Sequence, residues 1–408
     1  MNYPTNKLTP NFFATLNDKI IELKSAGADI IRLDIGSPDL PPAPHIVEVL
    51  TRSASRPDSH GYQPHRGIVA LREAWGEMYR RVHGVALDHE TEILPLLGSK
   101  EGVFHLSLAL LNPGDIVLIP DPGYQTYAQG ALLAEAKPVT VPLLPENNCL
   151  PDLSAIPTEI AQRAKILWLN YPNNPTAAIA PLEFFAEALD FCRRFNILLC
   201  HDAAYTQVTF DDYQAPSLLQ VPRAIELAVE FNTLSKSHNM AGWRSGVAVG
   251  QAEALAELLK IKSHADSGLF LPVTEASVAA LTGGQSWLAD RNAAYQERRD
   301  VVIAALREMG FSPQVPGASL YIWCPLPAAS PSDQFVLRLL EDAHVSLAPG
   351  TVFGPRGEGF VRISLVQPIA RIAEAMERIH LWRVKREAWS GKFRSPLSAS
   401  HSTTMDKL

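Results

Sequence analysis

The chain has 408 residues, of which 47% are hydrophobic and 19% charged, so it can bury a large core and favours two domains over one. Its net charge of -7 arises from acidic and basic residues scattered along the chain, which argues against a nucleic-acid partner. The polar N-terminus lacks the apolar stretch of a secretory signal, and no uncharged apolar run is long enough to span a bilayer, so we expect no membrane association.

Between about Glu92 and Gly250, short β-rich runs alternate with amphipathic stretches, a pattern typical of a mainly parallel sheet covered by helices. Residues 181–195 have apolar positions at helical spacing and predict a crossover helix between two parallel strands. The predicted strands are residues 93–97, 116–120, 166–170, 197–201, 225–231 and 247–250. In such a sheet, functional side chains gather beyond the carboxyl ends of the strands.

After Gly283-Gly284 the pattern changes and predicts a second, α+β domain. Its expected elements are a helix at 287–309, a strand at 319–324, a helix at 332–344 and a strand at 360–365. We therefore predict a large domain at 47–284 and a small one at 285–389. Residues 390–408, rich in Ser and Thr, predict a disordered tail.

Lys236 follows the strand that ends at Phe231-Asn232, and so lies at the carboxyl edge of the sheet. Burial or nearby positive charge lowers the pKa of a lysine and makes it a nucleophile toward an aldehyde. The hydroxyls of Thr233 and Ser235, together with Arg244, could bind a phosphate there. A single lysine is more often an exposed loop residue, so other positions must decide.

Two further loops end at the same edge. Asp202 directly follows its strand, and a carboxylate at that point can bind a protonated ring nitrogen or, alternatively, cap a helix. Asn174 lies in a loop stiffened by two prolines, which could hold its amide toward a cofactor oxygen or form a plain turn.

The segment Leu97-Gly98-Ser99-Lys100-Glu101-Gly102 joins a strand to a helix, whose first backbone N–H groups could cradle a phosphate. It lacks the glycine spacing of a nucleotide triphosphatase loop. Tyr124, behind a Pro-Gly turn, could stack on a flat heterocycle. Arg362 lies among apolar residues of a predicted strand and needs an anion, either a substrate carboxylate or an internal salt bridge.

The cysteines are widely spaced, with no C-x-x-C pair and no His cluster at metal-ligand spacing, so we expect no metal site. They are Cys149, Cys192, Cys200 and Cys324. We interpret them as buried hydrophobic residues of a cytoplasmic protein.

Taken in this order, the segments from about Leu33 to Leu365 resemble the fold-type I pyridoxal-phosphate aminotransferases, the aspartate aminotransferase superfamily. Residues 97–102, 201–205 and 262–268 are similar to LL-diaminopimelate aminotransferases in particular. Two departures stand out: Ala177 replaces the glycine that usually follows Asn-Pro-Thr, and Phe12-Phe13 offer no tyrosine hydroxyl to a polar substrate end.

The resemblance implies a pyridoxal 5'-phosphate cofactor and a homodimer, with an N-terminal segment 1–46 packed on the small domain. It makes Lys236 the residue that holds the cofactor covalently and acts as catalytic base, and Asp202 the partner of the ring nitrogen. It places Asn174 and Tyr205 at the cofactor's 3-oxygen and stacks Tyr124 on the ring. The phosphate would be held by Ser99, Lys100, Ser235 and Arg244, and by Tyr62 from the other subunit. The substrate would be met by Arg362, Asn174 and Gly36.

The implied function is ping-pong transamination from an amino acid, with LL-2,6-diaminopimelate as the expected donor and 2-oxoglutarate as the expected acceptor, in lysine biosynthesis. The residues leave two alternatives open. One is an aminotransferase for aspartate, alanine or aromatic amino acids, because a few pocket contacts determine the donor. The other is a pyridoxal-dependent carbon–sulfur lyase, because the same constellation stabilises the same carbanion.

Overall fold

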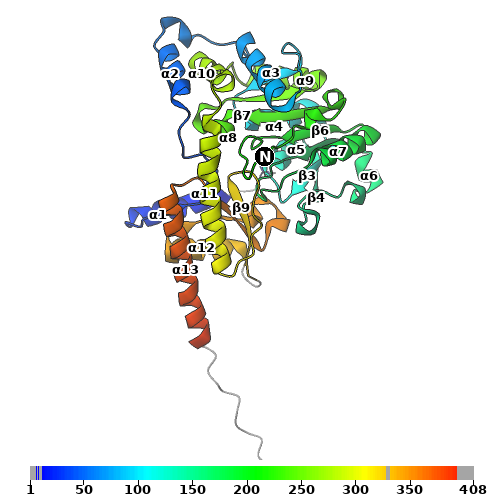
Figure 1. The fold of residues 1–408 in the computed structure, drawn as a ribbon. Helices are drawn as coiled ribbons and strands as arrows, with labels where there is room; N and C mark the ends of the chain where they lie inside the picture. The colour runs from blue at the N-terminus through cyan, green and yellow to red at the C-terminus, as the bar shows by residue number, and fades with distance from the viewer. Residues whose placement is uncertain (1–5, 7, 9–11, 328–330, 393–408) are drawn as a thin grey trace, which may run out of the picture.

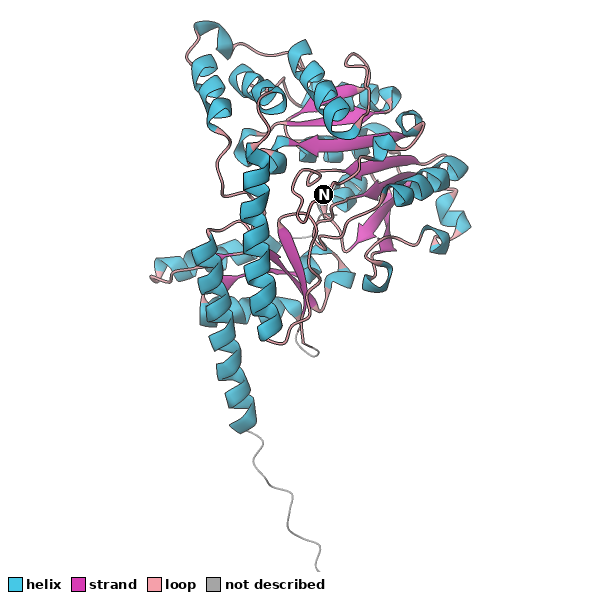
Figure 2. Ribbon diagram, viewed as in Figure 1, coloured by secondary structure: helices cyan, strands magenta, loops and turns pink. Residues whose placement is uncertain are grey.

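The computed structural model describes residues 6, 8, 12–327 and 331–392, with the backbone alone over 386–392. Its larger part is a seven-stranded sheet with helices on both faces (Figures 1 and 2). The strand order is β2-β8-β7-β6-β5-β3-β4, and all neighbours are parallel except β8, which is antiparallel to β2 and β7. The strands are β2 (Ile93–Leu96), β3 (Ile116–Asp121), β4 (Lys137–Pro142), β5 (Ala164–Leu169), β6 (Leu198–Asp202), β7 (Ala228–Thr233) and β8 (Gly246–Gly250).

Both faces of this sheet are buried, and successive residues of one strand serve opposite cores. Ile116 and Leu118 of β3 pack into one core, whereas Val117 and Ile119 pack into the other. This explains why the inner strands are nearly continuous apolar runs. The first core is covered by α2 (Pro44–Ala54), α3 (Val69–His83), α7 (Leu182–Phe195) and α10 (Leu271–Thr282), and the second by α4 (Ser99–Leu110), α5 (Thr126–Leu133) and α9 (Ala252–Ala265). Two short helices, α6 (Thr158–Ala161) and α8 (Leu234–Ser237), lie in the connections.

The mainly parallel α/β fold and all six predicted strands of the large sheet are confirmed. The predicted strand 225–231 is wrong at its start, because Ala224–Glu226 form a 3-10 turn and β7 begins at Ala228. Sequence reasoning missed the edge strand β4, since of its residues only Val141 is buried and no apolar run marks it.

The smaller part is built around a three-stranded sheet, β11-β12-β9, and a two-stranded one, β1-β10. The strands are β1 (Ile31–Arg32), β9 (Tyr321–Pro325), β10 (Val345–Ser346), β11 (Ala348–Pro349) and β12 (Phe360–Ser364), and the helices are α1 (Phe12–Ser25), α11 (Trp287–Glu308), α12 (Ser332–Ala343) and α13 (Ile369–Lys392). The long α11 runs from beside α8 down to this smaller part (Figure 1).

The N-terminal segment packs with the C-terminal part of the chain. β1 pairs in parallel with β10, and Leu16 and Ile20 of α1 share a core with Leu339 of α12 and Ile372 of α13. The domain limits at residues 46, 284 and 389 stay a prediction. The helix α13, which sequence reasoning missed, extends to Lys392 into the predicted tail, and the rest of that tail, residues 393–408, lies outside the described residues.

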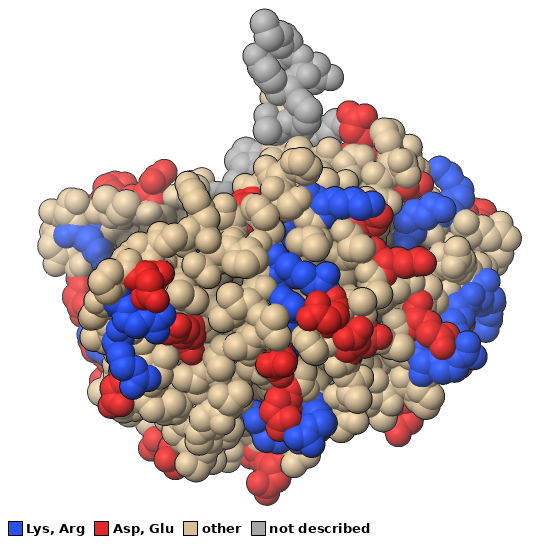
Figure 3. Space-filling model, turned by 90° about the horizontal axis from the view of Figure 1, so that it is seen from above, with Lys and Arg blue, Asp and Glu red and all other residues tan. Residues whose placement is uncertain are grey.

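Acidic and basic side chains are interspersed on the face shown in Figure 3, with no large area of one sign. Over the described part of the chain, none of the helices has both the length and the apolar character that crossing a bilayer requires.

Gly250 ends β8 with φ +132°, a conformation that side chains rarely adopt, and a Cβ there would lie 2.2 Å from the carbonyl oxygen of Ala228. We expect Gly250→Ala to lower the free energy of unfolding by about 2–4 kcal/mol, because strain and a backbone clash act together. Differential scanning calorimetry measures the effect. The control is Gly284→Ala, where a Cβ meets open space. Equal melting temperatures for the two variants would contradict this account of β8.

Candidate active site

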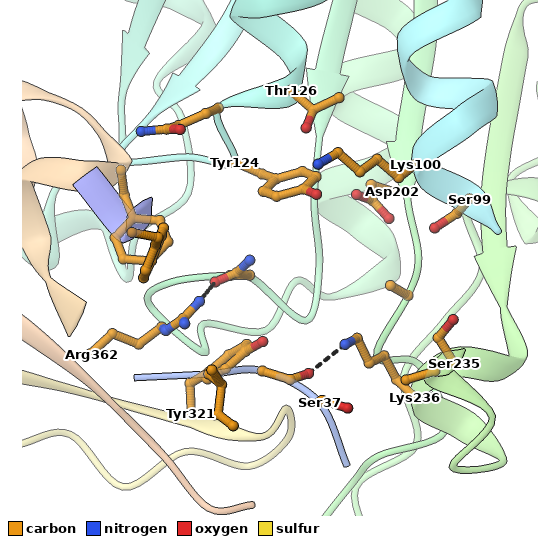
Figure 4. Close-up of a pocket in the computed structure, with 18 of the residues that line it drawn as sticks. Ser37, Ser99, Lys100, Tyr124, Thr126, Asp202, Ser235, Lys236, Tyr321 and Arg362 are labelled. Atoms are coloured by element: carbon orange, nitrogen blue, oxygen red, sulfur yellow. Dashed lines mark hydrogen bonds between the residues drawn. The ribbon is translucent and has the colours of Figure 1, made fainter. Parts of the chain in front are cut away.

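A cavity of about 780 Å³ lies between the large sheet and the smaller part of the molecule (Figure 4). Polar side chains reach it because β5, β6 and β7 run parallel and end at one edge. Of the predicted site residues, the cavity is lined by Gly36, Ser99, Lys100, Tyr124, Asn174, Asp202, Tyr205, Ser235, Lys236, Arg244 and Arg362. Tyr62 lies outside it, with its side chain 94% exposed.

Lys236 lies on α8, the helical turn that follows β7. The hydroxyl of Thr233 caps this turn by accepting the backbone N–H of Ser235 at 3.1 Å. The Lys236 ammonium nitrogen donates to the carbonyl oxygen of Gly36, which comes from the N-terminal segment (Figure 4). Burial lowers the pKa of Lys236, and the positive charges of Arg362 and Arg244 act in the same direction. The amine is therefore easier to deprotonate than that of an exposed lysine.

Asp202 is the last residue of β6 rather than a helix cap. Its Oδ2 accepts the hydroxyl of Tyr127 at 2.9 Å, and its backbone carbonyl accepts the amide of Asn170 at 2.7 Å. Oδ1 is buried and has no hydrogen-bond partner among the described residues. Burial raises the pKa of this carboxyl group. One carboxylate oxygen is thus held by the protein while the other is left without a donor.

The phosphate cradle predicted at residues 97–102 begins a helix, with Gly98 as the N-cap of α4. Gly98 has φ +80°, and a Cβ there would lie 2.2 Å from a guanidinium nitrogen of Arg244. That guanidinium also donates to the carbonyl of Ala241 at 2.8 Å. The ammonium of Lys100 lies 5.8 Å from the centre of the Tyr124 ring. The cations of Lys100 and Arg244, the helix N-terminus and the nearby Tyr124 ring can together accommodate a ligand that carries both a phosphate group and an aromatic ring.

Arg362 on β12 approaches the cavity from the opposite side. It donates to Oδ1 of Asn174 at 2.8 Å and to the backbone carbonyl of Asp34 at 2.7 Å. Its guanidinium carbon lies 4.1 Å from the ring centre of Tyr321 and 4.8 Å from that of Phe353. Among the described residues no carboxylate forms an ion pair with it, so the internal salt bridge considered above is wrong. Its positive charge stays available to an anion.

Asn174 has its side-chain oxygen engaged by Arg362, which leaves the amide nitrogen as its free end for donation. Its loop is closed by the side chain of Asn170, whose Oδ1 accepts the backbone N–H of Asn174 at 2.8 Å. Ala177 adopts φ +58°, which accounts for glycine being usual at that place in the family pattern.

Two tyrosines at the site were not found by sequence reasoning. The hydroxyl of Tyr321 lies 2.9 Å from that of Tyr205, and the pKa of Tyr321 is lowered because Arg362 and Lys236 outweigh its burial. Tyr127 binds Asp202 as described. Tyr321 lies within apolar sequence and was indistinguishable from a core residue, whereas Tyr127 lies three residues after Tyr124, to which the role at the site was given. The only available signal for Tyr321 was its place in a strand next to that of Arg362.

One group of side chains among the described residues has metal-ligand spacing: Glu101, His105 and Asp266. The ammonium of Lys262 already lies between the two carboxylates, at 3.4 Å from Glu101 and 2.8 Å from Asp266. Glu101 also accepts the backbone N–H of Leu97 at 2.7 Å. The group is an ion-pair network that supports the cradle.

A model of the aminotransferase class I and II family matches residues 28–379 of the chain. The LL-diaminopimelate aminotransferases of Moorella thermoacetica and Desulforudis audaxviator are 45% and 46% identical over 373 and 372 residues. These alignments cover 91% of this chain and 96% and 95% of the relatives. The structure of substrate-bound BacF from Bacillus subtilis superposes with a TM-score of 0.90 at 37% identity, over 94% of this chain and 97% of that one.

We expect Lys236→Met to stabilise the cofactor-free protein at neutral pH. The pKa of Lys236 is lower in the folded protein than in an unfolded lysine, so the unfolded chain binds the proton more tightly. Protonation therefore favours unfolding at any pH below the pKa of the unfolded lysine. The gain in melting temperature is full at low pH and disappears as the pH rises through about 10.4, the value of an unfolded lysine. Thermal melts from pH 6 to about pH 11 measure it. The exposed Lys260→Met serves as control, and the same profile for both variants would contradict the argument.

Proposed function

We propose a cofactor and a donor for this chain from the premise that it belongs to the class I and II aminotransferase family and is a transaminase. The proposed cofactor is pyridoxal 5'-phosphate. The proposed reaction moves the amino group of LL-2,6-diaminopimelate to 2-oxoglutarate, in lysine biosynthesis. The donor is that of the relatives at 45% and 46% identity.

The observation that supports the cofactor most directly is the unpartnered Oδ1 of Asp202, buried at the cavity that also holds the amine of Lys236. A buried carboxylate oxygen without a donor is unfavourable, and a protonated ring nitrogen would supply the donor. The cradle before α4 suits the phosphate of the same molecule. The residues at the cavity therefore fit the functional groups of pyridoxal phosphate.

In the proposed complex each part of the cofactor has its own partners. Ser99, Lys100, Ser235 and Arg244 would hold the phosphate, Asp202 the ring nitrogen, Asn174 and Tyr205 the 3-oxygen, Tyr124 the ring face and Lys236 the aldehyde carbon. When bound, pyridoxal phosphate supplies an electron-withdrawing ring that stabilises the charge left on Cα of the donor.

The chain itself orients the donor and moves its proton. Arg362, held by Asn174 and stacked on Tyr321, would bind the α-carboxylate in two hydrogen bonds. The amine of Lys236 would take the proton from Cα of the donor and deliver it to C4′ of the cofactor, and its lowered pKa favours the neutral form that this needs. Gly36 lets the backbone lie close to Tyr321 and to the donor, since a Cβ there would lie 2.0 Å from the Tyr321 hydroxyl.

The lining of the cavity is suited to a donor with a polar distal end. Asn17 and Arg32 line it together with the apolar Phe13. Arg32 donates to Asn17 at 3.0 Å and forms an ion pair with Asp34 at 2.6 Å. Charged and amide groups at one cavity fit the second amino-acid end of diaminopimelate better than a purely hydrocarbon side chain.

The proposal includes a homodimer in which Tyr62 reaches the phosphate of the partner's site. Its support is that Tyr62, a large side chain with a hydroxyl, is almost fully exposed in the single chain. The segment that carries it is held in place, because Gly268 donates its backbone N–H to the carbonyl of Gln63 at 3.2 Å. The four free and buried cysteines suit the proposed cytoplasmic location.

The donor is tested by half-reactions of the protein loaded with pyridoxal phosphate, without any keto acid. We expect LL-diaminopimelate to convert the visible absorption to that of the amine form of the cofactor, and Lys236→Ala to show no such conversion. Conversion by glutamate alone would overturn the donor but leave the enzyme class. Steady release of ammonia and pyruvate from cystathionine without an acceptor would instead indicate the carbon–sulfur lyase.

The dimer is tested by complementation between two inactive or weakened variants. Tyr62→Ala should weaken cofactor binding about tenfold, because a hydrogen bond to a charged phosphate is lost. In mixed dimers of Tyr62→Ala with Lys236→Ala subunits, one site has both an intact Lys236 and an intact Tyr62. We therefore expect activity at limiting cofactor to return in the isolated mixed dimer, measured with two affinity tags. No return would show that Tyr62 does not act across subunits.

A further inference from the structure

Tyr127 links the helix α5 to the carboxyl edge of the sheet. Its side chain is 1% exposed, and its hydroxyl donates to Oδ2 of Asp202 at 2.9 Å. An ionised carboxylate only accepts hydrogen bonds, and a phenol holds its proton more tightly than a carboxyl group does, so the proton lies on Tyr127. Burial, and then the charge of Asp202, raise the pKa of this tyrosine further. The bond therefore supplies the carboxylate with a permanent neutral donor.

Neighbouring rings fix the direction of that hydroxyl. The Tyr127 ring stacks on Trp168 with 4.9 Å between centres and 14° between planes, and Trp168 packs in turn on Phe231. On its other side Tyr127 meets the edge of Tyr124 at 5.8 Å. A tyrosine has only two side-chain torsions, so a ring held on two sides cannot turn its hydroxyl away from Asp202.

The bond also determines which oxygen of Asp202 remains available. The main chain at Asp202 is held by Asn170, and Oδ2 is held by Tyr127, so the carboxylate plane cannot rotate freely. Oδ1 is then the oxygen without a donor, in the residue that lines the cavity (Figure 4). The two oxygens of a carboxylate are chemically equivalent, so it is the contact with Tyr127 that determines which of them stays available.

We propose that Tyr127 is a positioning residue for Asp202: its hydroxyl keeps the carboxylate ionised and turned so that Oδ1 meets the ring nitrogen of the cofactor. This inference rests on the proposed cofactor. It extends the functional set beyond the cavity wall to a residue that touches neither donor nor cofactor. The alternative is that Tyr127 only fills the core between α5 and β5.

Protonation of Asp202 separates the two explanations, since a protonated carboxyl group has lost the negative charge that stabilises a protonated ring nitrogen. Burial raises the pKa of Asp202, and the Tyr127 hydroxyl lowers it. The other titratable groups acting on Asp202 are His201, its neighbour on β6, Lys236 on α8 and Tyr205. None of them changes in a Tyr127→Phe variant, which keeps the ring and removes one oxygen.

The experiment titrates cofactor-free full-length protein with pyridoxal phosphate from pH 5 to about pH 9 and follows binding by absorbance. For Tyr127→Phe we expect a dissociation constant about tenfold higher than that of the wild type, with the acid limb of binding moved to higher pH. The KM for the amino donor should change less than about twofold, because Arg362 and its contacts are untouched.

Tyr171→Phe is the matched control, because Tyr171 is also a buried tyrosine whose hydroxyl donates to a backbone carbonyl, that of Cys149, at 2.7 Å. Equal effects of the two variants on cofactor affinity would overturn the inference in favour of core packing. A double-mutant cycle with Asp202→Asn adds a second criterion: Tyr127→Phe should have no further effect in that background. Wild-type protein that binds no pyridoxal phosphate would instead refute the proposed function itself.

Discussion

The burial of both faces of the seven-stranded sheet is the constraint on which the rest of the molecule depends. Since alternate residues of each inner strand enter opposite cores, the strands are mostly apolar, and the polar groups of the cavity lie where the strands stop. His201 and Glu230, which lie inside β6 and β7, are buried and hydrogen-bonded to each other at 2.8 Å. Asp202 ends β6, Asn170 follows β5, and Lys236 follows β7 within one helical turn. A single parallel edge thus concentrates an acid, an amide and an amine.

Lys236, Arg362 and Asp202 all line the cavity at this edge, and each of these charged side chains has a different environment. Burial lowers the pKa of Lys236, and the charges of Arg362 and Arg244 add to this effect, so its amine loses its proton more readily than an exposed lysine. Arg362 is packed against two rings and, within the described part of the chain, donates to neutral oxygens alone, so its positive charge remains available to an anion. Oδ2 of Asp202 accepts from Tyr127, whereas Oδ1 has no hydrogen-bond partner among the described residues. Each side chain is held in position by its neighbours, but its charge or hydrogen-bonding capacity is not fully used within the described residues. A ligand that supplies the missing partner binds such preorganised groups most favourably.

Much of this could be predicted from the sequence, for physical reasons that differ between residues. Lys236 and Asp202 each follow an apolar strand, and parallel strands end together, so their meeting follows from local pattern. The helix start at Ser99 was recognisable because a strand and a glycine precede it, and its role as a phosphate cradle stays a prediction. Tyr127 and Tyr321 could not be found this way. The sequence around a tyrosine does not tell whether its hydroxyl meets a carboxylate, another hydroxyl or a backbone carbonyl, because the packing of distant segments determines that contact.

The pairing of Ile31 with Val345 has a consequence for how the chain is made. The ribosome delivers β1 and the apolar face of α1 long before their partners in β10, α12 and α13, because the whole large sheet lies between them in the chain. Until then those apolar residues lack many of the residues with which they share a core, and loop closure over such a separation is slow. The large sheet, whose strands are contiguous in the chain, is free to fold meanwhile. We therefore expect the small unit to fold after the large sheet. Gly36 and Arg362 then reach the cavity only at that later stage of folding.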